Sequence, residues 1–257
     1  MKRSNSPSQP SQDASALTIN ITGFSSQLND NIDWREKEIL DLEQCLLPEG
    51  VKREGPQYDA RRKCIWVMLY AHYEGFFKFA LGLYVSEINK LRLSCGAAHA
   101  MMTTWSLDSV FQDMEYGESK DAFFNRHLPE EPVVHRIARR FRVVSELRTL
   151  DEKVVEIQDT AYSTKSNLDY SRLQQLLYQA GFDHDVFSKY DDSQGEKRGG
   201  RIRHLVKMRN TIAHTASSER ITPDEYEKIR RDVFEIMKEF TQLLIGACES
   251  QKYLRII

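Results

Sequence analysis

The sequence predicts an all-α protein that folds as an antiparallel helical bundle. Residues 58–91 contain no proline, and the segment 65–85 is apolar on all sides, as in a helix at the centre of a bundle. Residues 222–225 are Thr-Pro-Asp-Glu, which combines a cap residue, a first-turn proline and a capping-box glutamate and so begins a further helix. The alternation typical of a strand is limited to a hint at residues 17–21.

Length and composition allow one large domain, or a domain with a sizeable insertion. The chain has 257 residues, of which 40% are hydrophobic, enough for a real core. Its formal net charge of -2 argues against a protein that coats nucleic acid non-specifically, because such proteins carry a broad basic face. Any anionic partner must therefore be held by a local group of cations.

Cysteine usage and the N-terminal sequence predict a cytoplasmic protein. The chain has four cysteines, which are too few and too scattered for a disulfide framework or a CxxC zinc site. Its first residues, MKRSNSPSQPSQ, lack the apolar segment of a signal peptide, and no uncharged stretch is long and apolar enough to span a bilayer. We expect reduced thiols and no contact with a membrane.

The first elements follow from composition and capping signals. Residues 1–30 begin with a run of Ser, Gln, Pro and Asn that cannot bury enough apolar surface to order itself, so we expect a mostly disordered tail. Asp33 followed by Glu36 indicates a capping box, which begins a helix over 33–47. The Pro-Glu-Gly segment at 48–50 ends that helix.

The remaining residues form one domain, 31–257, in this prediction. Its core helices cover about 58–91 and 200–250, and a long, mainly helical insertion, 92–198, separates them. Within the insertion, apolar spacing predicts helices near 104–114, 132–149 and 168–180. The glycine-rich segment 191–200 is expected to be a loop before a helix over 202–215 and a final helix from Thr222 to about Ser250.

Several families of enzymes are excluded by missing motifs. The chain has no P-loop, no GxGxxG after a strand, no HExxH, no GxSxG and no EF-hand loop. We therefore expect no cofactor and no metal.

The segment between Glu196 and Glu219 is basic. It contains no acid and six cations: Lys197, Arg198, Arg201, Arg203, Lys207 and Arg209. Such a surface attracts phosphate, although an ordinary solvated helix face is the alternative.

Arg209 differs from the other cations because it shares a helix face with apolar residues, so its guanidinium needs a carboxylate from elsewhere or a phosphate. The stretch from Arg209 to His214, R-N-T-I-A-H, resembles the R-x(4-6)-H motif of the HEPN superfamily. The pairs Arg92/His99 and Arg198/His204 also fit this spacing, but only Arg209/His214 lies on a periodic helix followed by another long helix. A second stretch, LYAHYEGFFKF at 69–79, resembles the aromatic-rich early helix of one toxin-like HEPN branch.

The resemblance implies a metal-independent endoribonuclease, in which His214 is the acid or base and Arg209 stabilises the transition state. A histidine and a guanidinium suit cleavage of RNA by its own 2′-OH, and Asn210 could orient either partner. Arg201, Arg203 and Lys207 would bind RNA. The resemblance also implies a prokaryotic toxin or phage-defence effector, with an antitoxin protein as a possible partner. A non-catalytic HEPN-type interaction module, or a phosphate- or nucleotide-binding regulator, is the alternative.

Helix geometry predicts a homodimer. On an ideal helix Arg209 and His214 are about 140° and 7.5 Å apart, so one copy does not readily bring both onto one phosphate. Two copies related by a twofold axis could do so.

Glu74 is a carboxylate on an apolar stripe, and its expected partner is Arg209 or, alternatively, Lys78. We interpret His72 as a packed or surface histidine. His204, about 80° from His214 around the helix, could approach the same groove, which is the weaker alternative.

Two further groups of residues have a plain structural interpretation. The aromatic residues of the long early helix are expected in the core rather than in a base-stacking platform; they are Trp66, Tyr70, Tyr73, Phe76, Phe77, Phe79 and Tyr84. The basic run HRIARRFR at 135–142 is expected to be a solvated face, with guidance of RNA as the alternative.

Overall fold

A computed structural model describes most of the chain; the described residues are 18–48, 54–118, 120–147, 149–165, 167–190, 200–215 and 219–255. Within them the protein is all-α, as predicted, and no strand is formed. The only β-type contacts in this part are two isolated antiparallel bridges, Ser94 with Val154 and Ala98 with Leu254. The strand-like alternation at 17–21 therefore has no counterpart, because Ile21 begins a helix.

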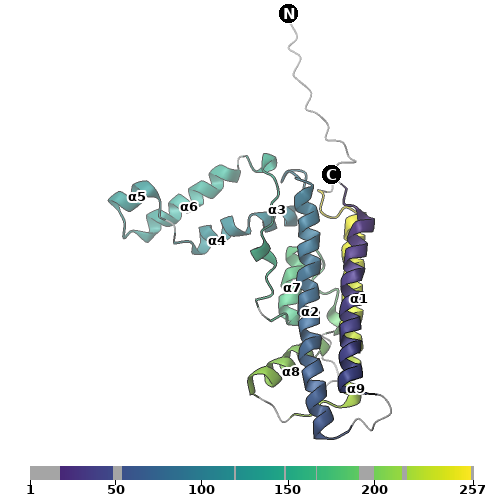
Figure 1. Ribbon diagram of the computed structural model, residues 1–257. Helices are drawn as coiled ribbons and strands as arrows, with labels where there is room; N and C mark the ends of the chain where they lie inside the picture. The colour runs from purple at the N-terminus through teal and green to yellow at the C-terminus, as the bar shows by residue number, and fades with distance from the viewer. Residues whose placement is uncertain are drawn as a thin grey trace, which may run out of the picture.

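Three long helices form the body of the molecule (Figure 1). They are α1 (Ile21–Leu46), α2 (Pro56–Lys90) and α9 (Pro223–Glu249). Helix α1 runs antiparallel to the other two, and α2 packs against both of them and against α8 (Arg201–Thr215). This central position of α2 agrees with a helix that is apolar all round.

The core is dominated by the aromatic residues of α2. Six of the seven residues that we assigned to the core are buried, and Phe79 is partly buried against them. Phe77 stacks on Phe240 of α9 with ring centroids 4.6 Å apart, a geometry that adds to the burial of apolar area. The interpretation of these side chains as core, rather than as a stacking surface for bases, is confirmed.

The start of α1 was predicted wrongly. The helix begins at Ile21 instead of Asp33, and its N-cap is Asn20, whose side chain accepts a hydrogen bond from the Gly23 N–H at 3.1 Å. The buried residues of α1 recur every three or four positions along its length: Phe24, Leu28, Ile32, Arg35 and Ile39. This stripe packs on the bundle and extends the helix into residues 21–30, which we had assigned to the tail. Residues 1–17 lie outside the described part.

The ends of the other core helices agree closely with the sequence. Helix α2 begins at Pro56 and ends at Lys90, within two residues of the expected bounds. Helix α9 has the predicted capping box: the Thr222 hydroxyl accepts from the Glu225 N–H, and the Glu225 carboxylate accepts from the Thr222 N–H.

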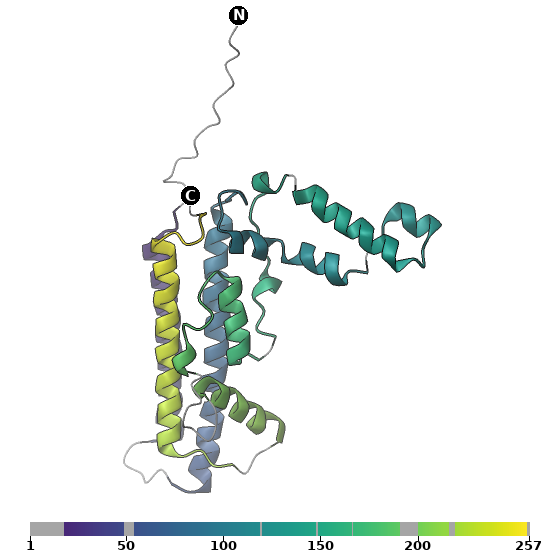
Figure 2. The same ribbon diagram turned by 180° about the vertical axis from the view of Figure 1, so that it is seen from behind.

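The insertion has two parts (Figures 1 and 2). Helices α3 (Ala100–Ser106) and α7 (Tyr170–Gln179) lie beside the bundle, whereas α4 (Asp108–Tyr116), α5 (Ala122–His127) and α6 (Pro132–Leu147) form an arm that projects from it.

The structure differs from the predicted helices of the insertion in three places. The helix expected near 104–114 is divided at Leu107 into α3 and α4, and α5 was not expected. Helix α7 is capped by Asp169 instead of Asn167, and it ends before Gly181, whose φ of 78° suits glycine. Most of the expected loop at 191–200 lies outside the described residues. Where the chain is described, no helix is both long and apolar enough to cross a membrane.

Candidate functional site

Helix α8, which carries the Arg209-to-His214 stretch, is fixed to the N-terminal half of α2. Its buried residues are Ile202, His204, Leu205, Val206 and Met208. The indole Nε1–H of Trp66 on α2 donates to the Leu205 carbonyl oxygen at 3.1 Å. This bond uses a carbonyl in the middle of α8, so it sets the position of the helix along α2. Figure 1 shows α8 running outward from α2, and the helix continues after Leu205 to Thr215.

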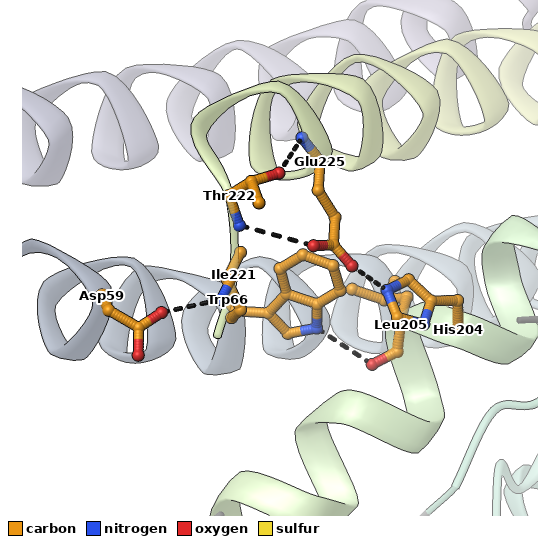
Figure 3. Close-up of polar contacts among 7 residues, drawn as sticks. All are labelled: Asp59, Trp66, His204, Leu205, Ile221, Thr222 and Glu225. Carbon is orange, nitrogen blue, oxygen red and sulfur yellow. Dashed lines mark hydrogen bonds and ion pairs between the residues drawn. The ribbon is translucent and has the colours of Figure 1, made fainter. Parts of the chain in front are cut away.

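A cluster of polar contacts joins the start of α9 to α8 and α2 (Figure 3). The Glu225 carboxylate that caps α9 also binds the His204 Nε2 at 2.7 Å. The Trp66 and His204 rings are nearly perpendicular, at 81°, with their centroids 5.4 Å apart. Asp59 of α2 accepts a hydrogen bond from the Ile221 N–H at 2.7 Å. His204 is therefore engaged by α9 and Trp66, which makes it part of the joint between the helices and not of a groove shared with His214.

Arg209 lies partly buried against α2. Its guanidinium carbon is 4.8 Å from the centroid of the Tyr70 ring, within the range of a cation–π contact. Its Nη1 donates to the Asn210 Oδ1 at 2.7 Å. The ring and the amide together hold the guanidinium without neutralising its charge, so the group remains available to an anion.

Tyr70 connects Arg209 to the insertion. The Tyr70 hydroxyl accepts from the Leu168 N–H at 2.9 Å and lies 3.4 Å from the Asn167 Oδ1. Burial raises the pKa of Tyr70 well above its ordinary value, and the carboxylate of Glu74 raises it further, whereas the Leu168 N–H and the Arg209 cation lower it. The phenol therefore stays protonated, and its ring is a fixed, neutral platform beneath the cation.

Glu74 is held by a residue that no sequence pattern indicated. Its carboxylate accepts a hydrogen bond from the Thr164 hydroxyl at 2.5 Å. Within the described residues, Glu74 forms neither the expected ion pair with Arg209 nor the alternative pair with Lys78. The Arg209 guanidinium lies over Tyr70, one turn earlier on α2 than Glu74, and Lys78 is exposed. The expected pairing was therefore wrong. Tyr70 and Thr164 are the two site residues that sequence reasoning missed: Tyr70 was counted only as core, and Thr164 lies in a segment without a motif.

His214 does not meet Arg209 in one copy of the chain. Its side chain is exposed in the last turn of α8 and makes no hydrogen bond or ion pair with any described residue. The separation of about 140° on a helix explains why only Arg209 faces Tyr70. Within one copy of the chain, the imidazole and the guanidinium therefore face different directions.

The proposed RNA-binding cations have different surroundings. The Arg201 Nη1 lies 3.0 Å from the Asp232 Oδ1, so the charge of Arg201 is partly compensated by α9. Burial raises the pKa of Asp232, while the Arg201 cation lowers it. Arg203 and Lys207 are exposed, and for these two residues both the phosphate-attracting and the solvated interpretation stay open. Lys197 and Arg198 lie outside the described residues.

His72 is a packed histidine, one of the two interpretations made from the sequence. It is buried between α1 and α2, where its Nδ1 lies 3.3 Å from the Arg35 Nη1 and its Nε2 lies 3.2 Å from the Glu38 Oε2. This group contacts α1 and has no contact with Arg209. Among the described residues, no group of three or more His, Cys, Asp or Glu side chains could hold a metal ion.

Comparison with known proteins gives one match. The sequence model of the family described as HEPN_MAE_28990-like HEPN matches residues 24–253, which include α8, α9 and the whole insertion. Among curated proteins and solved structures, none matches the chain significantly.

Proposed function

Because the chain belongs to the HEPN_MAE_28990-like HEPN family, we propose that it is a metal-independent endoribonuclease. The observation that carries the proposal is the arrangement on α8. A guanidinium that keeps its charge is positioned by Tyr70 and Asn210, and an exposed imidazole follows in the last turn of the same helix. A cation for the phosphorane oxygens and an imidazole for proton transfer are two of the groups that cleavage of RNA without a metal uses.

The proposed reaction uses the ribose 2′-hydroxyl of the substrate as nucleophile. A base removes the 2′-OH proton, the oxygen attacks the adjacent phosphorus, and the bond from phosphorus to the 5′-oxygen breaks. An acid returns a proton to the leaving 5′-oxygen, so the products are a 2′,3′-cyclic phosphate and a 5′-hydroxyl. His214 carries out one of the two proton transfers and solvent water the other, and Arg209 donates hydrogen bonds to the phosphorane oxygens. Asn210 orients the guanidinium; Glu74 acts indirectly, as a positioning residue beside Tyr70.

The proposal includes a homodimer. Since Arg209 and His214 face different directions on α8, we place the scissile phosphate between two α8 helices, with Arg209 from one copy and His214 from the other. Arg203 and Lys207, which are exposed on the same helix, would hold the neighbouring phosphates of the RNA.

Incubation of the purified protein with RNA in EDTA tests the activity. We expect cleavage products with 2′,3′-cyclic phosphate ends, and no cleavage of a substrate whose scissile nucleotide is 2′-deoxy. His214→Ala and Arg209→Ala should each lower kcat/KM by about a hundredfold or more, the usual range for loss of a proton-transfer group or an oxyanion donor. A folded, dimeric wild-type protein that leaves RNA intact would exclude the enzyme.

Mixing the two inactive variants tests the shared site. A heterodimer of Arg209→Ala and His214→Ala contains one complete site, made from the His214 of one chain and the Arg209 of the other. After exchange of subunits we expect about a quarter of the wild-type activity, because half of the dimers are mixed and each has one of two sites intact. If the mixture stays inactive although the subunits exchange, the two residues act within one copy.

One observation favours the non-catalytic alternative, an HEPN-type interaction module. Arg209 is bound by Tyr70 and Asn210 without any ligand, as a purely structural guanidinium would be. The cleavage assay separates the two functions. Saturable binding of a nucleotide that is lost in Arg209→Ala, with the nucleotide recovered unchanged, would instead identify a phosphate-binding regulator.

We extend the proposal to a toxin or phage-defence effector that an antitoxin protein restrains. The basis is the resemblance of residues 69–79 to the aromatic-rich early helix of one toxin-like HEPN branch. Expression of the wild-type chain in bacteria should then stop growth, whereas His214→Ala should not, at matched protein levels.

A further inference from the structure

The arm exposes an apolar stripe that the fold of this chain does not cover. Along α6 the exposed apolar side chains are Val133, Ile137, Phe141, Val144 and Leu147. They recur every three or four residues, so they lie on one face of the helix. Phe141 is 72% exposed and Ile137 is 57% exposed, which is unusual for large apolar side chains gathered in one stripe.

Residues of α6 outside the stripe make the contacts that hold the arm together. His135 and Val143 are the buried residues of α6, and α6 packs against α4 and α5. Arg142 lies 3.9 Å from Asp113 of α4 across this contact. The apolar stripe is therefore not needed to fold the arm, and a second surface is needed to cover it.

The charges beside the stripe decide what kind of surface fits. Arg136 and Arg140 follow the stripe on one edge of α6 and are exposed, and neither has an acidic partner among the described residues. A complementary surface would place carboxylates opposite these two cations and apolar side chains opposite Ile137 and Phe141.

A second copy of this chain fits poorly. In an antiparallel pair of α6 helices centred on Phe141, the Arg140 side chains of the two copies would lie next to each other and repel. The chain's own segments outside the described residues do not fit either. Residues 1–17 have one acid, Asp13, against Lys2 and Arg3, and residues 191–199 have no apolar residue.

An anionic membrane is also disfavoured. Glu130 and Glu131 directly precede α6 and are exposed, and further acids lie in the adjoining part of the arm, at Glu118 and Asp121. An amphipathic helix that binds anionic lipid carries exposed cations along its whole polar face, whereas in α6 Arg142 lies 3.9 Å from Asp113 and Arg139 is partly buried.

We propose that the exposed face of α6 binds an acidic amphipathic helix of another protein, whose apolar residues pack on Val133, Ile137, Phe141 and Val144 and whose carboxylates pair with Arg136 and Arg140. The arm leaves the bundle beside the C-terminal part of α2, whereas α8 packs on the N-terminal half of α2 (Figure 1). Binding at the arm is thus a property separate from the proposed cleavage site, and it leaves that site open.

A designed peptide provides the probe. We would use a fluorescein-labelled helical peptide with leucines at the a and d positions and glutamates beside them, and a matched peptide with lysine in place of glutamate. By fluorescence anisotropy, the glutamate peptide should bind the full chain saturably and at least about tenfold more tightly than the lysine peptide.

Variants locate the binding. The double change Ile137→Ser and Phe141→Ser should weaken binding of the glutamate peptide by about tenfold or more. Arg136→Glu with Arg140→Glu should reverse the preference between the two peptides. Tyr178→Ser, at an exposed aromatic residue on α7, is the matched control and should bind as the wild type does. All of these positions are exposed, so circular dichroism should give the wild-type spectrum for each variant.

Four results would overturn the proposal. The first is the absence of saturable binding by the glutamate peptide, and the second is binding that the stripe and arginine variants do not change. The third is a dimer that the double serine change dissociates in sedimentation velocity, which would make a second copy the occupant. The fourth is co-sedimentation with phosphatidylserine vesicles that depends on Ile137 and Phe141, which would make the membrane the occupant.

Discussion

At the residue scale, the contact of Arg209 with Tyr70 is what distinguishes this arginine from the other cations of α8. Arg203 and Lys207 are exposed, whereas the Arg209 guanidinium is held over an aromatic ring whose hydroxyl is fixed by the Leu168 N–H. A ring positions a cation without neutralising it. The insertion therefore contacts Tyr70 through the Leu168 N–H and the Asn167 side chain, and not through a charged side chain.

Two substitutions at Tyr70 separate the ring from the hydroxyl. Tyr70→Phe keeps the platform under Arg209, so we expect cleavage within a few-fold of the wild type. Tyr70→Leu removes the platform and should lower kcat/KM on RNA by up to about thirtyfold more, because a cation–π contact contributes about 0.5–2 kcal/mol. Both variants lose the bond to Leu168, and Tyr70→Leu also removes part of a buried ring, so it should lose more stability in urea unfolding than Tyr70→Phe. Equal cleavage by the two variants would show that the ring does not position Arg209.

The buried His72 makes stability depend on pH. Burial and the neighbouring Arg35 cation lower the pKa of His72, while Glu38 raises it. An unfolded histidine has a pKa of about 6.5, so below that pH the unfolded chain binds a proton that the folded chain does not bind. The free energy of unfolding should therefore fall as the pH decreases from about 6.5 towards the lowered pKa, with a slope of up to about 1.4 kcal/mol per pH unit.

Urea unfolding of His72→Asn between pH 5 and 8 checks this dependence. Asparagine can keep an acceptor near the position of Nδ1, so Arg35 retains a partner while the titrating group is lost. We expect a flatter profile than that of the wild type. His184→Asn is the control, because His184 is exposed between Asp183 and Asp185 and has these neighbours in the unfolded chain as well. An unchanged slope in His72→Asn would assign the pH dependence to other groups.

The candidate site was predictable in part from the sequence. The spacing of Arg209 and His214 and their place on a periodic helix were enough to choose them from among three matching pairs. The partner of Glu74 was not predictable. A carboxylate on an apolar stripe requires a donor, but Thr164 is 90 positions away along the chain and belongs to a segment with no pattern that would bring it there.

At the scale of elements, capping signals decided which helix ends could be predicted. Thr222 and Glu225 specify the start of α9 because each satisfies the backbone N–H of the other. For α1 two candidate caps compete, Asn20 and Asp33. The apolar stripe that begins at Phe24 packs on the bundle and so favours Asn20 as the cap. A capping motif is local and does not reveal this tertiary packing. No Gly or Pro lies near Leu107, where α3 and α4 are divided, so the sequence contained no signal for this break.

The cap of α9 provides a prediction for this scale. Thr222→Ala removes the side chain that accepts from the Glu225 N–H, and it should lower the free energy of unfolding by about 1 kcal/mol. Thr222→Ser keeps the hydroxyl and should lose less than half as much. Urea denaturation followed by circular dichroism measures both. Equal loss in the two variants would mean that the methyl group, and not the cap, accounts for the effect.

At the scale of the whole molecule, the chain combines a well-packed bundle with an arm that buries little. Helix α2 has buried residues along its whole length, from Tyr58 to Ile88. Helices α4 and α5 have no buried residue, and α6 has only His135 and Val143. The bundle was predictable because its helices carry apolar periodicity of their own. The projection of the arm was not, since the α6 stripe has the pattern of a core helix although its apolar face is exposed.

Hydrogen exchange measured by mass spectrometry tests this contrast. Segments with few buried apolar contacts open locally at a smaller free energy than the global unfolding, so amides of α4 to α6 should exchange well before those of α2 and α9. A partner that covers the α6 stripe adds the burial that the arm lacks, so the acidic peptide should slow exchange in the arm and leave α2 unchanged. If the arm of the free protein is protected as strongly as α2, its exposed stripe is already covered in solution, and the low stability inferred from its burial is wrong.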